Sequence, residues 1–214
     1  MRTLEDLIDT KDAARPLVRE RAQGASHPFE ILAPSEDQNR VLLALQVTTR
    51  STMGAVAYET GGLLIDHGWL RVLGSGHPKL ARNIVDWNKG RSSGFLLVAD
   101  DVVGGFFALN GGGLGDDAGA MYYWAPDTLA WESLEIGYSD FLGWASTDRL
   151  QAFYADLRWS GWEADMKSVG ADQCFSFYPF LWTKEGSVQA SARKAVSIAE
   201  QYALNKELAT TTGK

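Results

Sequence analysis

Cysteine is nearly absent from this sequence: the 214 residues include one, Cys174. An internal disulfide is therefore impossible, and a reducing cytoplasm is the expected compartment. Long hydrophobic runs are also missing, and no apolar stretch approaches the roughly 18 residues that a membrane-spanning helix needs. Residues 1–21 alternate charged with apolar side chains, unlike a secretion signal. We therefore expect a cytoplasmic protein that has no membrane partner.

Positive charge is absent from a long central segment, residues 92–148, which contains no lysine, arginine or histidine. The carboxylates of this segment are Asp100, Asp101, Asp116, Asp117, Asp127, Glu132, Glu135, Asp140 and Asp148. The chain has a formal net charge of −7 and a pI of about 5.0. Such a balance argues against nucleic acid or an anionic membrane as the main partner, because both would repel it. It is compatible with a basic protein partner.

Histidine is scarce as well, and the sequence has only His27, His67 and His77. One combination, Asp66 and His67 with His77, could bind a metal or a substrate, but turn formation explains these residues better. Nucleophilic catalysis needs a serine or cysteine activated by a base, and Cys174 has no cationic neighbour in the sequence. The glycine-rich stretch 111–115 lacks the Lys-Ser/Thr pair of a phosphate-binding loop. The residues therefore indicate no metal, no cofactor and a non-enzymatic protein.

The chain is apolar enough, at 45% hydrophobic residues, for one α+β domain over residues 1–214. Apolar runs bounded by turn residues predict a pair of strands within 62–74 and single strands at 94–99, 105–110, 120–124 and 129–134. Because the connections between residues 94 and 134 are short, the four strands of this region are expected to form an antiparallel meander. Helical spacing predicts helices at 3–22, 80–88, 138–144, 147–159 and 187–208. The expected domain thus has an N-terminal helix, a sheet and a C-terminal extension.

An aromatic strand lies inside the acidic segment. Tyr122, Tyr123 and Trp124 are consecutive, so both faces of their strand carry a ring. At least one ring is expected to be exposed unless a terminal helix covers it. The aspartate pairs 100–101 and 116–117 could hold Mg²⁺ or act as acid and base, but neighbours on an extended segment point opposite ways and turn formation explains them better. Exposed rings beside carboxylates are typical of protein interfaces.

Several stretches carry a family resemblance: LQVTTRS from Leu45, GGLLIDHGWLRVLGSG from Gly61, ADDVVGGFFALNGG from Ala99, YYWAPDTLAWE from Tyr122 and FYADLRWSGWE from Phe153. They resemble an uncharacterised bacterial family that is defined only as a domain of unknown function, which implies no activity. The order of strands, acidic turn, glycine loop and aromatic strand over residues 34–150 is also similar to the SUKH superfamily. That resemblance implies an α+β fold with a twisted, mainly antiparallel sheet and packed helices. It also implies a role like that of bacterial immunity proteins, which bind and neutralise toxins, and it leaves residues 158–214 without a counterpart.

Three interpretations of function remain open. The first is a non-enzymatic, immunity-protein-like binding protein that engages a basic protein or toxin through an acidic aromatic face made of Asp100, Asp101, Asp116, Asp117, Tyr123, Asp127 and Glu132. The second is an enzyme or small-ligand protein whose pocket, near the Gly111 loop, is lined by Asp66, His67, Trp69 and His77. The third is a homo-oligomer in which the extended segment 175–182 pairs across a dimer.

Overall fold

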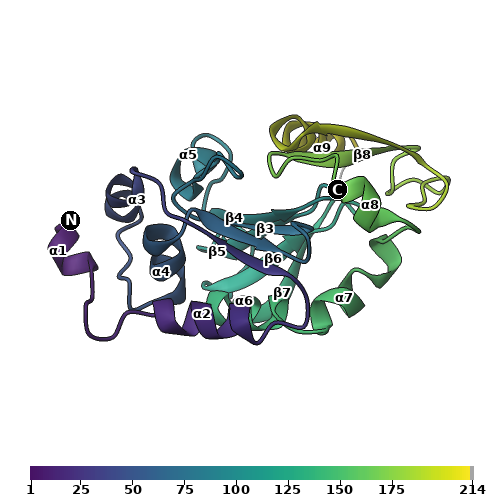
Figure 1. Ribbon diagram of the computed structural model, residues 1–214. Helices are drawn as coiled ribbons and strands as arrows, with labels where there is room; N and C mark the ends of the chain where they lie inside the picture. Colours follow the sequence, from purple (N-terminus) through teal and green to yellow (C-terminus); the bar gives the residue numbers. More distant parts are fainter. Residues whose placement is uncertain (213–214) are drawn as a thin grey trace.

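The computed structural model describes residues 1–212, which form a sheet of seven antiparallel strands, a separate two-stranded sheet and surrounding helices (Figure 1). The strands of the large sheet pair in chain order and are β1 (Phe29–Leu32), β2 (Gly62–Ile65), β3 (Leu70–Leu73), β4 (Phe95–Asp101), β5 (Phe106–Asn110), β6 (Ala120–Trp124) and β7 (Trp131–Gly137). The small sheet pairs β8 (Gln173–Tyr178) with β9 (Ala192–Ser197). The fold is therefore α+β, as the sequence predicts.

The helices connect and cover these strands. In chain order they are α1 (Leu4–Leu7), α2 (Arg15–Gln23), α3 (Gln38–Leu45), α4 (Thr52–Glu59), α5 (Ile84–Asn88), α6 (Tyr138–Ala145), α7 (Arg149–Phe153), the 3-10 turn η1 (Ala155–Leu157), α8 (Trp162–Met166) and α9 (Ile198–Thr212). Within residues 1–212, none of them combines the length and the apolar character that crossing a bilayer requires.

The predicted antiparallel meander is confirmed and is longer than expected, because β3, β2 and β1 continue it beyond β4, with Phe29 of β1 opposite Ile65 of β2. The hairpin between β2 and β3 turns where the sequence predicts it. Gly68 has the expected positive φ of 80°, and the two residues before it also lie in the left-handed region. A turn of this kind fits the twist of the flanking strands.

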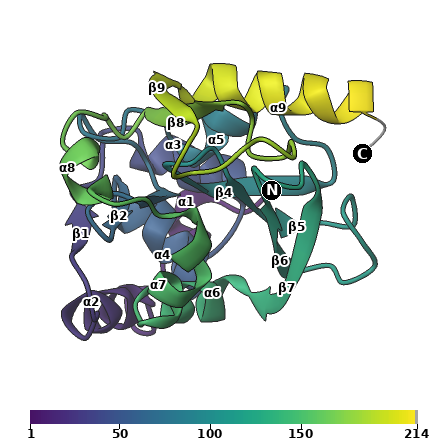
Figure 2. The same cartoon turned by 90° about the vertical axis from the view of Figure 1, so that its right-hand side faces the viewer.

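Helices cover both faces of the large sheet (Figures 1 and 2). On one face, Phe107 of β5 packs against Phe141 of α6, with 5.0 Å between ring centroids. On the other face, the neighbouring Phe106 packs against Tyr202 of α9 at 4.8 Å. Adjacent strand residues point to opposite faces, so this one pair of phenylalanines joins the two helical layers to the sheet.

The predicted helix over 187–208 is wrong in its first half. Residues 192–197 form β9, which pairs with β8 through contacts such as Cys174 opposite Val196, and the helix begins only at Ile198. Residues 175–178 of the segment proposed to pair across a dimer belong to β8 and therefore already pair with β9 of the same chain. Burial raises the pKa of the Cys174 thiol to about 12, which agrees with the structural role predicted for it.

Two other predicted helices are broken in the structure. The segment 3–22 divides into α1 and α2, because the Asp9 side chain accepts hydrogen bonds from the backbone N–H groups of Lys11 and Asp12 and forms a turn there. Thr3 caps α1 through reciprocal hydrogen bonds with Asp6. The segment 147–159 divides into α7 and η1 at Tyr154, whose hydroxyl donates a hydrogen bond to the buried carboxylate of Asp101.

Candidate functional site

Asp100 lies in the protein interior, and its predicted place on an exposed binding face is wrong. Its side chain is fully buried at the end of β4, where Arg71 Nε donates to Oδ1 over 2.7 Å. Arg82 donates to Oδ2 and also pairs with Asp172 Oδ1 at 2.7 Å. Two guanidinium groups thus neutralise this carboxylate inside the fold, as a buried charge requires.

Asp101 and Tyr123 are buried as well, which corrects the same prediction for both residues. Asp101 Oδ1 accepts the backbone N–H groups of Val103 (3.0 Å) and Gly105 (2.7 Å). Its Oδ2 accepts the hydroxyls of Tyr123 and Tyr154, each at 2.8 Å. Burial raises the pKa of Asp101, and these hydrogen bonds oppose the shift. The two aspartates point to opposite sides of β4, as their spacing predicts, but both sides are covered.

Alkaline pH is expected to destabilise the protein through Tyr123, Tyr138 and Tyr154. Burial raises the pKa of all three hydroxyls, and the Asp101 carboxylate adds to the shift for Tyr123 and Tyr154. Near pH 10 the unfolded chain can lose these protons and the folded chain cannot. The contribution of these three groups to stability is therefore constant below that pH and falls above it, by about 4 kcal/mol per pH unit.

The measurement is tyrosinate absorbance recorded together with far-ultraviolet circular dichroism along a pH titration. We expect the three phenolates to appear only as the helical signal is lost. Ionisation of all seven tyrosines at about pH 10 with the fold intact would contradict this expectation. The same titration in denaturant provides the control.

The alternative pocket around Asp66 and Trp69 does not form. Asp66 is buried in an ion pair with Arg158. Trp69 is fully buried, and its ring packs against those of Tyr154 and Trp162 at centroid distances of 5.4 and 5.0 Å. Neither side chain lines an open cavity, whereas His67 and Gly68 of the same turn line a separate cavity of about 440 Å³ together with Glu163 and Lys167.

The remaining members of that predicted pocket lie far apart. His67, in the turn before β3, is near the Asp101 end of β4, because Leu70 pairs with Asp101. Gly111 follows β5 and lies at the Phe95 end of the same strand, about 20 Å away along the sheet. His77 also lies beyond the far end of β3, where its ring nitrogen accepts the N–H of Lys79. These histidines do not converge. Within residues 1–212 there is no group of three or more His, Cys, Asp or Glu side chains suited to a metal ion.

The other predicted acidic residues do lie at the surface, along the last two strands of the large sheet. They are Asp116, Asp117, Asp127 and Glu132. Asp117 accepts the hydroxyls of Tyr122 (2.6 Å) and Ser133 (2.9 Å), and the hydrogen bond from Tyr122 is the largest cause that lowers its pKa. These four carboxylates are exposed and have no salt-bridge partner among the described residues.

β7 is an edge strand, because no strand in the described part of the chain pairs with its outer side. It also contains a β-bulge. Tyr122 lies opposite Ser133 and Ala120 opposite Gly137, so β7 has extra residues between these two pairs. Glu135, within the bulge, has a positive φ of 57°, a strained value for a residue other than glycine. Bulges of this kind redirect side chains and are frequent beside binding sites.

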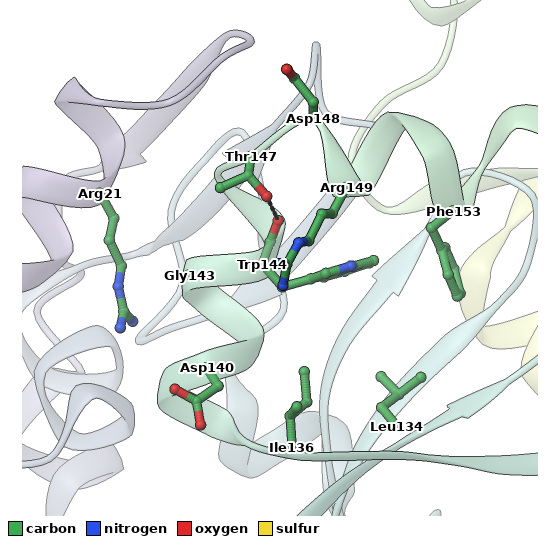
Figure 3. Close-up of a pocket in the computed structure, with 10 residues that line it drawn as sticks. All are labelled: Arg21, Leu134, Ile136, Asp140, Gly143, Trp144, Thr147, Asp148, Arg149 and Phe153. Carbon is green, nitrogen blue, oxygen red and sulfur yellow. Dashed lines mark hydrogen bonds between the residues drawn. The ribbon is translucent and has the colours of Figure 1, made fainter.

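A cleft of about 740 Å³ opens beside this bulge and is the candidate functional site (Figure 3). Its lining residues come from α2, β7, α6 and α7 and are Arg21, Leu134, Ile136, Asp140, Gly143, Trp144, Thr147, Asp148, Arg149 and Phe153. The volume suits one small molecule or one large side chain of a partner. The lining includes no histidine or cysteine, and it offers apolar surface and charged groups of both signs for binding.

Arg21 is the lining residue with the most constrained environment. Its guanidinium lies over the backbone of Gly143, where a Cβ would be 3.7 Å from the guanidinium carbon. Nη2 donates to Ser139 Oγ over 3.1 Å, while Nη1 is buried without a hydrogen-bond partner among the described residues. Burial lowers the pKa of Arg21, and Asp140 opposes the shift.

Comparison with known proteins places the chain in a family. A family model described as "Protein of unknown function DUF2625" matches residues 4–201. The chain belongs to this family. The match confirms the resemblance to an uncharacterised bacterial family, and it includes β8, β9 and the start of α9.

Relatives of nearly equal length share much of the sequence. The uncharacterised protein YbfG of Escherichia coli (strain K12) is 46% identical over 215 residues, covering 99% of each chain. An uncharacterised protein of Haemophilus influenzae (strain ATCC 51907 / DSM 11121 / KW20 / Rd) is 39% identical over 214 residues, covering 96% of this chain and 94% of the relative. No solved structure matches the chain significantly. DUF2625 membership thus identifies relatives of the whole chain but no activity.

Sequence reasoning missed most of the cleft. Trp144 and Phe153 belong to the predicted helices 138–144 and 147–159, and each side chain remains partly exposed. Leu134 was expected to end the strand that in fact continues as far as Gly137. No local signal marks Arg21, which reaches the site from α2, more than a hundred residues earlier in the chain.

Proposed function

We propose that this DUF2625 protein is a non-enzymatic binding protein that holds a basic, extended segment of a partner protein along the free edge of β7. The observation that carries the proposal is the 740 Å³ cleft beside that edge. An extended segment can pair with an open sheet edge and insert one side chain into a neighbouring pocket. Here Leu134 and Ile136 of the bulge, with the rings of Trp144 and Phe153, offer an apolar lining for that side chain.

Charge supports a basic partner. Asp127, Glu132 and Glu135 are exposed along β7 and the turn before it, and none of them has a salt-bridge partner in the described part of the chain. Unpaired carboxylates of this kind raise the association rate of a cationic partner. The SUKH-like sequence pattern implies a role of the same class, since immunity proteins bind toxins.

Charged residues and a bulge on an edge strand also prevent unwanted strand pairing between molecules. That protective role does not require a cleft beside the strand. The half-buried Leu134 and Ile136 face such a cleft together with two arginines and two aspartates, and this favours a binding role.

Reversing charge on β7 is expected to slow partner association by about tenfold or more. The variant Glu132→Lys with Glu135→Lys replaces attraction with repulsion at the proposed contact. The measurement is biolayer interferometry against basic proteins encoded beside the gene, at low and high salt. The matched control, Glu185→Lys with Glu207→Lys, makes the same change in net charge at two exposed residues outside β7 and the cleft.

We expect the control variant to associate at nearly the wild-type rate, and added salt to slow the wild type more than the β7 variant. Hydrogen exchange of the complex should show protection of the 131–137 amides. Equal association of the two double variants, or protection confined to another surface, would overturn the proposal.

A further inference from the structure

A second cavity, on the opposite face of the large sheet, has a different chemistry. It has a volume of about 440 Å³ and lies between α9, the segment 90–95 and the adjoining ends of β6 and β7. Figure 2 shows α9 on the side of the sheet away from α6 and α7. The residues that line this second cavity are Gly90, Arg91, Ser92, Ser93, Phe95, Trp124, Trp131, Tyr202, Lys206, Ala209 and Thr210.

Aromatic rings form one wall of this cavity. Trp131 packs against Phe95 and against Trp124, in both cases with 5.3 Å between ring centroids. Phe95, Trp124 and Trp131 are each only half-buried, although they lie on strands of an aromatic-rich sheet. Half-exposed rings in a concave site provide a surface on which a flat ring can stack.

The charged groups of the cavity are both cations. Arg91 and Lys206 line it, and no aspartate or glutamate does, although the chain has a net charge of −7. The first cleft, in contrast, has two arginines balanced by two aspartates. A cavity with cations alone and hydroxyl groups from Ser92 and Ser93 suits an anionic group.

Arg91 is held in place before any ligand binds. Its guanidinium stacks on the ring of Trp87 at 4.3 Å, and Nη1 donates to the Trp87 carbonyl over 3.0 Å. The Tyr202 hydroxyl donates to the Arg91 carbonyl over 2.8 Å and ties α9 to this segment. A cation that is fixed in this way loses little side-chain entropy on binding.

We propose that this cavity binds a planar aromatic molecule that carries one anionic group. The ring of the ligand stacks on Trp131 and Trp124, and its phosphate or carboxylate lies between Arg91 and Lys206. The site is separate from the β7 edge and does not depend on the function proposed above.

The test is isothermal titration calorimetry of the full chain with adenosine 5′-monophosphate and with indole-3-acetate. Each probe carries a flat bicyclic aromatic ring and an anionic group, a purine with a phosphate in the first and an indole with a carboxylate in the second. Adenosine lacks the charge, and ribose 5-phosphate lacks the ring. We expect at least one ring-bearing anion to bind with a Kd below about 1 mM. The matched compounds without the charge or without the ring should bind about tenfold more weakly.

Lys206→Met keeps the apolar part of the side chain and removes its charge, and it is expected to weaken binding of that anion about tenfold. Lys184→Met makes the same change at an exposed residue outside the cavity and should leave the affinity unchanged. Binding of either probe alone would support the proposal and identify the combination of ring and anion that fits the cavity. No binding of either probe, equal binding of ring-free ribose 5-phosphate, or an unchanged affinity in Lys206→Met would overturn the proposal.

Discussion

Replacing Asp100 by alanine is expected to lower the free energy of unfolding by about 3–5 kcal/mol. The side chain of Arg71 is only 1% exposed and Asp100 is its acidic partner, so the substitution leaves a guanidinium charge in the core without compensation. Arg82 loses a partner at the same time. The measurement is guanidinium chloride unfolding followed by tryptophan fluorescence.

Two further variants make this prediction specific. Asp172→Ala removes the other carboxylate of Arg82, but Asp172 is 40% exposed, and its loss is expected to cost less than about 1 kcal/mol. Asp100→Asn keeps an oxygen acceptor for Arg71, so we expect an intermediate loss in the free energy of unfolding of about 1–3 kcal/mol. This variant tests the same contact if the alanine variant fails to fold. An Asp100→Ala protein within about 1 kcal/mol of wild type would show that the buried pair does not need its anion.

Gly105→Ala is expected to cost about 3–4 kcal/mol, from overpacking together with lost hydrogen bonds to a buried charge. A Cβ at residue 105 would overlap both the Tyr123 hydroxyl and Asp101 Oδ2. The added methyl group would therefore separate the donor and the acceptor of a buried hydrogen bond. Thermal and denaturant unfolding measure the effect.

Gly137→Ala is the matched control, because it adds the same methyl group at a glycine where the nearest atom to the new Cβ is 4.0 Å away. The backbone there has φ −83° and ψ 171°, which alanine adopts without strain. We expect a change within about 0.5 kcal/mol. Equal stability of the two alanine variants would rule out a steric role for residue 105.

The parts of the fold that depend on local pattern could be predicted from the sequence. Alternation and turn residues gave the strands at 62–74 and 105–110 and the aromatic strand 120–124, and short connections gave their antiparallel order. The segment 187–197 could not be predicted, because small and charged residues suit a helix as well as a strand. It becomes β9 because Cys174 and its neighbours in β8 supply the backbone partners.

The acidic segment also combines features that the sequence predicts with features that only the structure shows. The sequence indicates that Asp100 and Asp101 point to opposite sides of one strand, and the structure confirms it. Burial of both depends on side chains from distant parts of the chain: Arg71 and Arg82 on one side, Tyr154 on the other. Asp127 and Glu132 belong to the same run of negative charge and remain exposed, and neither forms a salt bridge with a described residue.

The amino-acid sequence by itself determined the α+β class, the order of the meander, the lack of disulfides and a central segment without positive charge. Each of these follows from composition or from spacing along a few neighbouring residues. Only the tertiary structure decided which carboxylates are neutralised in the core and which face outward, and it alone assembled the two cavities. The reason is physical: a buried charge needs a partner at hydrogen-bond distance, and a cavity needs walls from several elements, and neither relationship is encoded by residues adjacent in the chain.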